Sequence, residues 1–169
     1  MNAISLMVEE HKNIKRVLKV IRKLCVKILN GETVNYKAFN MIVDFVRNYA
    51  DSHHHSKEED ILFKKMSEEL GEEIAKGPIY GMFADHDMGR LYIRKLVEAL
   101  DKVKKGDEDS KVDVIANAIS YTDLLYRHID KEDNGWIGNA EKWKPLDKAP
   151  VQQESLLIRL MLWMPSVIV

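Results

Sequence analysis

The chain has 169 residues, of which 46% are hydrophobic and 31% charged, and its formal net charge is −1. This length suits one compact domain, and the small net charge gives no general electrostatic reason to bind nucleic acid or an anionic membrane. Cys25 is the single cysteine, which excludes an internal disulfide and a Cys-rich zinc site. The first residues lack the pattern of a signal peptide, and no apolar run is long enough to span a bilayer, so a cytoplasmic location is expected.

Apolar residues recur at steps of three and four along four segments, which is the spacing of an amphipathic helix. In chain order, the predicted helices span residues 3–29, 35–70, 79–105 and 110–133. Glycine-containing connections separate them, and Asn134-Gly135 is expected to end the last one. Four such helices with short connections predict an all-α fold, an up-down-up-down antiparallel four-helix bundle.

The last part of the chain differs in composition from the bundle. Residues 1–135 form the predicted bundle, and residues 136–169 are expected to be a loop followed by a short apolar helix. That extra C-terminal segment is too short to cross a membrane. It would serve as the contact of a homodimer, as a cover over the open end of the bundle, or as an ordinary packed helix.

Each predicted helix carries one histidine on its apolar stripe: His11, His54, His86 and His128. A single histidine in such a position is usually a core residue with a hydrogen-bond partner. Four buried imidazoles without partners would cost several kcal/mol in total, which a shared metal would remove. In an antiparallel bundle the beginnings of odd helices meet the ends of even ones, so the four histidines are expected in roughly one layer.

Two glutamates strengthen the case for a metal. Glu58 follows His54 by four residues, and Glu132 follows His128 by four. Residues four apart lie on one face of a helix, so each pair can reach the same metal cluster. Helical bundles that hold two irons combine imidazole ligands with such carboxylates.

The triplet from His53 to His55 requires a choice, because His55 also has a glutamate, Glu59, four residues later. The helical face of His54 carries apolar residues, whereas the face of His55 carries Asp44, Asn48 and Asp51. We therefore predict that His54 points into the core, and that His53 and His55 lie on solvated faces or at a helix boundary.

These stretches together resemble the hemerythrin-like, HHE cation-binding family. The resemblance rests on EEHKNI around His11, HHSKEEDILF from His54, ADHDMGR around His86 and LLYRHIDKED around His128, and it covers about 130 residues in the order of the family. It implies a bundle that binds two irons. Family members carry or sense dioxygen, respond to nitric oxide or oxidative stress, handle iron, or help to repair iron centres.

Carried over residue by residue, the resemblance implies a ligand set of His11, His54, Glu58, His86, His128 and Glu132. Oxygen-carrying hemerythrins have a further histidine four residues after the ligand of the third helix, and here that position is Arg90, which cannot ligate iron. The set is then similar to the version with four histidines and two glutamates, which leaves one iron short of a ligand. Water, Tyr92, Tyr121 or an exogenous ligand would fill the gap, and reversible oxygen carriage is put in doubt.

Three functions remain open on the sequence. The first is a di-iron protein, a binding or sensing protein rather than an enzyme, that meets O2 or NO or handles iron under stress. The second is a di-iron redox enzyme that reduces peroxide, and the third is a metal-free helical interaction protein. Iron follows from the resemblance alone, since mixed imidazole and carboxylate ligands also suit manganese and zinc.

Overall fold

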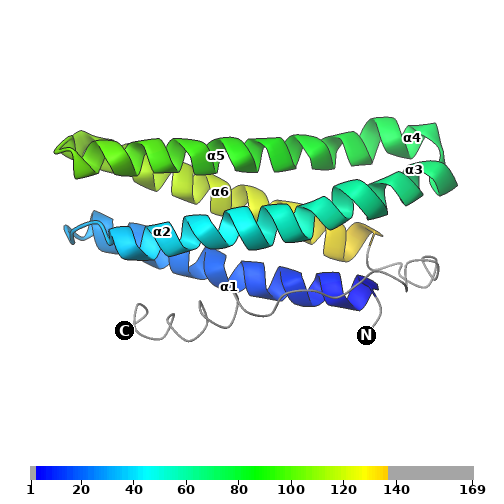
Figure 1. The fold of residues 1–169 in the computed structure, drawn as a ribbon, viewed down its shortest axis with the longest axis horizontal. Helices are drawn as coiled ribbons and strands as arrows, with labels where there is room; N and C mark the ends of the chain where they lie inside the picture. The colour runs from blue at the N-terminus through cyan, green and yellow to red at the C-terminus, as the bar shows by residue number, and fades with distance from the viewer. Residues whose placement is uncertain (1–2, 137–169) are drawn as a thin grey trace.

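The computed structural model describes residues 3–136, which form a bundle of four long helical segments packed antiparallel (Figure 1). The first segment is α1 (Ala3–Leu29). The second runs without a break in direction through α2 (Tyr36–Phe45), η1 (Val46–His55), η2 (Glu58–Leu62) and α3 (Phe63–Leu70). The third is α5 (Tyr80–Lys104), and the fourth is α6 (Lys111–Lys131), which continues into η5 (Glu132–Trp136). The short elements α4 (Glu72–Ile74), η3 (Ala75–Ile79) and η4 (Glu108–Ser110) connect them.

The predicted fold class is confirmed, and no strand occurs among residues 3–136. The last helix was expected to end at Asn134-Gly135, but the helical path runs through both residues to Trp136. The predicted C-terminal loop and apolar helix lie outside the described residues. Within the described part of the chain, no helix combines the length and the apolar character that a bilayer crossing requires.

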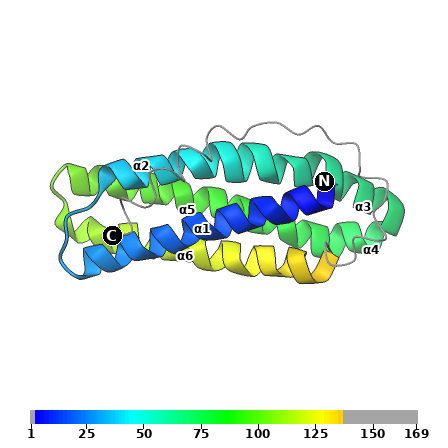
Figure 2. The ribbon, with the colours of Figure 1, turned by 90° about the horizontal axis from the view of Figure 1, so that it is seen from below.

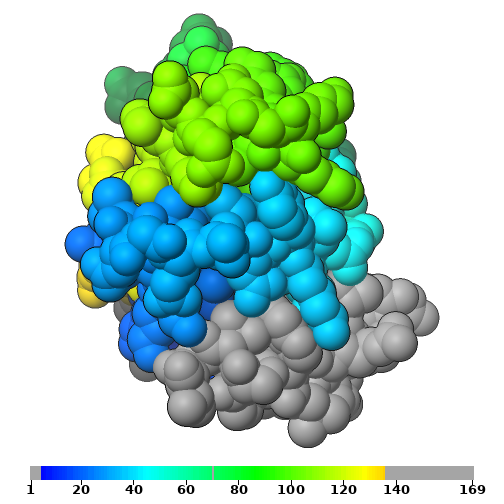
Figure 3. Space-filling view, turned by 90° about the vertical axis from the view of Figure 1, so that its left-hand side faces the viewer, coloured from blue at the N-terminus to red at the C-terminus, as the bar shows by residue number. Residues whose placement is uncertain are grey.

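The beginning of α1 and the end of α6 lie at the same end of the bundle, next to the α3–α4 connection (Figures 1 and 2). Figure 3 looks onto the opposite end, which the two other connections close. There Gly31 and Gly106 have φ angles of 86° and 101°, which only glycine adopts without strain. Asn35 caps α2, since its side-chain oxygen accepts a hydrogen bond from the Ala38 amide at 3.0 Å.

Buried apolar residues form two separate clusters along the bundle axis. The larger one runs from Ile14 to Ile28 on α1 and includes Phe39 and Phe45 on α2. The smaller one gathers residues from the other end: Met7, Leu62, Phe63, Met66, Ile79 and Met82. On the first three segments the predicted ligands fall between the two clusters in sequence, so apolar side chains enclose a polar layer on both sides.

The second segment is not a regular α-helix where it passes the polar layer. Val46–His55 and Glu58–Leu62 are π-helical, with hydrogen bonds from residue i to residue i+5. The wider turn places neighbouring side chains at a smaller angle around the helix axis than in an α-helix. Two consecutive residues can therefore both face the interior, and here His54 and His55 do so.

Candidate metal centre

Donor atoms from three helical segments converge in a first group made of His11, His54, Glu58 and Glu132, with one atom of each residue within 4.8 Å of the others. His11 comes from α1, and His54 and Glu58 from the second segment, one turn apart. Glu132 begins η5 at the end of α6. All four side chains are buried. The structure thus brings together, in one place, residues separated by more than a hundred positions in the chain.

A second buried group lies beside the first and consists of His55, Glu58, His86 and His128. The Nε2 atoms of His86 and His128 lie 3.2 Å apart. The ring of His55 stacks on the ring of His86 with centroids 3.9 Å apart and nearly parallel planes. All six residues of the predicted ligand set therefore belong to one or other group, and His55 joins them.

The two glutamates face both groups at once. Glu58 Oε1 lies 3.2 Å from His54 Nε2, whereas its Oε2 lies 3.4 Å from His86 Nε2. Glu132 is placed in the same way, with Oε2 3.3 Å from His11 Nε2 and Oε1 3.4 Å from His128 Nε2. Each carboxylate thus offers one oxygen to each group, which is the arrangement of a carboxylate that bridges two metal ions.

The polar atoms at the centre fit a metal pair because the described part of the chain does not satisfy them. Both oxygens of Glu58 and of Glu132, and the Nε2 atoms of His11 and His54, are buried without a hydrogen-bond partner there. Buried polar atoms are normally paired, and each unpaired one costs about 1–3 kcal/mol. Oxygen and nitrogen donors aimed at a common centre suit divalent first-row metals.

The outward Nδ1 atoms of the four predicted histidine ligands each face a carboxylate on the preceding segment, and the four contacts close a ring around the bundle. Glu10 of α1 lies 2.8 Å from His54, and Glu59 of η2 lies 2.7 Å from His86. Asp85 of α5 lies 3.5 Å from His128, and Asp133 of η5 lies 2.7 Å from His11. Such carboxylates fix the tautomer and orientation of a metal-binding imidazole and leave Nε2 free for the metal.

A cation lies on the outer side of each of these carboxylates. Lys57 contacts Glu10, Lys15 lies 2.8 Å from Asp133, and Lys131 lies 2.9 Å from Asp85. Arg90 lies 2.7 Å from Glu59 and 2.8 Å from Asp51. The site is thus built in layers, with the imidazoles and the two glutamates inside, carboxylates around them, and cations towards the surface.

The prediction that His55 lies on a solvated face is wrong, because its side chain is only 4% exposed. The expectation assumed an α-helical turn, and the π-helical backbone of η1 rotates His55 inwards instead. His53 does stay outside the two groups, with its Nε2 3.1 Å from Glu10 and 3.1 Å from Lys57. Sequence reasoning also missed the outer carboxylates, although four of them directly adjoin a predicted ligand in the chain: Glu10, Glu59, Asp85 and Asp133.

Neighbouring charges shift the pKa values of several groups in this cluster. Burial opposes the charged form of His11, but the nearby carboxylates of Asp133, Glu132 and Glu58 raise its pKa to about 11. Burial likewise opposes charging of His54, and Glu58 and Glu10 raise its pKa to about 9. The charge of His54 and the nearby imidazoles of His11 and His86 hold the pKa of Glu58 well below its usual value, against the effect of burial. The surrounding carboxylates therefore favour the protonated forms of His11 and His54.

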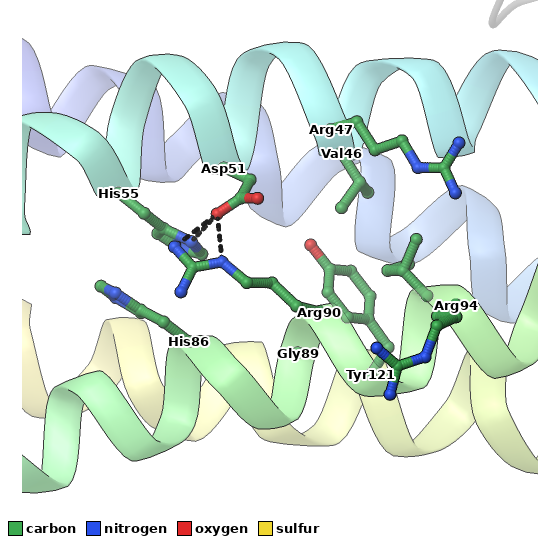
Figure 4. Close-up of a pocket in the computed structure, with 10 residues that line it drawn as sticks. Val46, Arg47, Asp51, His55, His86, Gly89, Arg90, Arg94 and Tyr121 are labelled. Carbon is green, nitrogen blue, oxygen red and sulfur yellow. Dashed lines mark hydrogen bonds and ion pairs between the residues drawn. The ribbon is translucent and has the colours of Figure 1, made fainter.

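A cavity of about 120 Å³ adjoins the second group between η1 and α5, and His55 and His86 form part of its wall (Figure 4). Tyr121 points its hydroxyl into this space, and that hydroxyl is buried without a hydrogen-bond partner in the described residues. Arg90 lies across the cavity beside Asp51. Of the two tyrosines considered as substitutes for a histidine at position 90, Tyr121 lines this cavity and Tyr92 does not.

Fold and site together define a class of protein: an antiparallel four-helix bundle with two buried groups of imidazoles and carboxylates suited to a binuclear metal site. The comparison with protein families identifies the particular family. The model of the Hemerythrin HHE cation binding domain matches residues 2–140, so the chain belongs to the hemerythrin HHE cation-binding family. No curated protein and no solved structure gives a significant match.

Proposed function

We propose that this protein binds two iron ions and that the pair binds a small diatomic ligand, O2 or NO. One ion would lie between His11 and His54, and the other beside His86 and His128, with Glu58 and Glu132 between the two. The observation that carries the proposal is that each glutamate offers one oxygen to each group, while these oxygens lack hydrogen-bond partners in the described residues. Manganese and zinc accept the same donors, and iron is chosen because of the family.

The chain's own residues would bind and insulate the pair. The ring of carboxylates orients the imidazoles, and the apolar clusters on either side keep bulk water away from the polar layer. An iron pair, when bound, supplies an open coordination position and the electrons that ligand binding or peroxide reduction requires. The proposed role is a binding or sensing protein of the cytoplasm that acts in stress response or iron handling, rather than an enzyme.

Metal content per chain after anaerobic ferrous reconstitution and desalting tests the proposal. We expect about two irons in the wild type, and the same in His53→Ala, whose side chain lies outside both groups. His54→Ala should lose iron. No iron in a folded wild-type protein, or no effect of His54→Ala on metal content and stability, would instead favour a metal-free interaction protein.

Addition of NO to the ferrous protein addresses the ligand. We expect a change in the optical spectrum, because an exogenous ligand would occupy a position that the protein donors leave open. Absence of any change in a fully loaded protein would count against gas binding. Turnover of hydrogen peroxide with a general reductant would then move the assignment to a di-iron redox enzyme.

A further inference from the structure

His55 is a buried imidazole with no assigned task. Neither of its ring nitrogens has a hydrogen-bond partner among the described residues. An imidazole that only fills space inside a protein would normally bind a neighbouring donor or acceptor, because an unpaired buried polar atom is costly. Its position beside the two glutamates and four other histidines makes a metal the obvious partner to consider.

Two features of His55 match those of the predicted histidine ligands. First, a ring nitrogen of His55 lies within 4.8 Å of donor atoms from Glu58, His86 and His128, so it shares their centre. Second, its Nδ1 faces a carboxylate, with Asp51 Oδ1 3.5 Å away. The distance equals that between Asp85 and the Nδ1 of His128. His53, the other neighbour of His54, lies outside both groups.

We propose that His55 is the fifth imidazole ligand of the metal pair, so that one ion has three imidazoles, from His55, His86 and His128, and the other has two, from His11 and His54. The proposal rests on the binuclear centre proposed above. Glu58 and Glu132 would connect the two ions.

Arg90 then has a different role from the histidine that oxygen carriers have at its position. Its guanidinium contacts Asp51 Oδ1 at 2.8 Å and Glu59 Oε1 at 2.7 Å. Asp51 faces His55 (Figure 4). Glu59 faces His86. Arg90 is thus a positioning residue that holds the carboxylates behind two imidazoles. The arginine at position 90 does not reduce the number of imidazole ligands, because His55 from the π-helical turn of the second segment takes the place of a histidine on the third helix.

The competing explanation is that His55 is structural and binds water in the adjoining cavity, whose wall it shares with His86. The two explanations differ in what a metal titration measures. A structural His55 affects folding but not the affinity of either ion once the protein is folded. A ligand His55 affects one ion selectively and changes the average number of imidazoles around the metal.

The experiment compares His55→Ala and His55→Gln with His53→Ala and the wild type. Gln keeps much of the size and polarity of the side chain, which preserves the fold should Ala disturb it. Each protein is titrated anaerobically with ferrous ion against a chelator, and X-ray absorption of the loaded samples reports imidazole ligation. Thermal unfolding of the metal-free forms reports stability separately.

We expect two tightly bound ions in the wild type and in His53→Ala. In both His55 variants one ion should bind at least about tenfold more weakly, since even the loss of a residue behind a ligand costs 10–100-fold. The imidazole contribution per metal should fall as well. Two ions bound with wild-type affinity and an unchanged absorption spectrum in His55→Gln would overturn the role of His55 and leave the binuclear centre intact. A wild type that binds no metal would overturn the proposed function itself.

Discussion

The most informative single substitution outside the ligand set is Glu10→Gln. Glu10 is buried, its Oε2 lies 2.8 Å from His54 Nδ1, and its Oε1 contacts both His53 and Lys57. In the glutamate, one oxygen contacts His54 and the other contacts His53 and Lys57, whereas the glutamine side chain has only one acceptor oxygen. Its NH2 group must then face either the Lys57 ammonium or the protonated Nδ1 of His54, which is a repulsive contact.

The size of the expected loss in metal affinity can be estimated. Removal of the partner behind a metal-binding histidine costs about 10–100-fold in metal affinity, or roughly 1.4–2.7 kcal/mol. Because Glu10 is buried and has three partners, we expect Glu10→Gln near the upper end. Glu9→Gln is the matched control, since Glu9 is the preceding residue, is exposed and pairs with Lys12, three residues further along the same helix, at 2.5 Å. An exposed pair of this kind contributes at most about 1 kcal/mol to stability and should leave the metal unaffected.

Competition against a chelator of known affinity measures the effect in both variants, with thermal unfolding of the metal-free proteins as the check on folding. The reasoning predicts weaker binding in Glu10→Gln and wild-type binding in Glu9→Gln. Equal metal affinity of the two variants would refute the orienting role of the carboxylate ring, whatever their stabilities.

Three further predictions concern pH, reactivity and packing. Metal affinity should rise between about pH 6 and about pH 8, by about tenfold per pH unit for each proton that the metal displaces. The reason is that His11 and His54, with pKa values of about 11 and about 9, hold protons that the metal must replace. A flat pH profile would contradict this. Burial raises the pKa of Cys25 to about 11, so iodoacetamide should label the thiol only after unfolding. The free energy of unfolding should decline above about pH 9, because there the thiol of the unfolded chain loses its proton while the buried thiol keeps it. Phe39→Ala, at a fully buried site, should lower the free energy of unfolding by about 3–5 kcal/mol in urea titrations, and a loss below about 1 kcal/mol would mean that the core collapses around the gap.

The fold was predictable because each helix is long and its apolar residues keep helical spacing. The ends of α1 and α5 agree with the predicted ends to within one residue. Not every apolar side chain of these helices is buried, however, since Ile61 is 36% and Phe83 38% exposed. Each lies next in sequence to a member of the smaller apolar cluster, Leu62 or Met82.

The site was predictable where it followed the same spacing and not where it departed from it. His11, His54, His86 and His128 lie on apolar stripes, and the structure brings them together with Glu58 and Glu132. His55 was misplaced because a step of 3.6 residues per turn does not hold in η1. Nothing in composition announces a π-helical stretch, so the angular position of His55 required the backbone itself.

The outer carboxylates were hidden for another reason. Glu10 adjoins His11 in sequence but bonds His54, and Asp133 adjoins Glu132 but bonds His11. Each contact crosses to another helix, and one sequence carries no information about which neighbour a residue meets across a helix interface. Adjacency to a predicted ligand was a usable hint, but the partner was not deducible.

The cations outside the carboxylate ring connect the protein surface to its centre. Lys131 is 54% exposed, and two contacts, through Asp85, separate its ammonium from His128. A change in charge at this lysine, such as acetylation, would leave Asp85 a stronger acceptor towards the imidazole and the imidazole a stronger electron donor. High salt would act in the same direction by screening the outer pair. Through Asp85, the charge of an exposed lysine thus lies within two contacts of a buried imidazole.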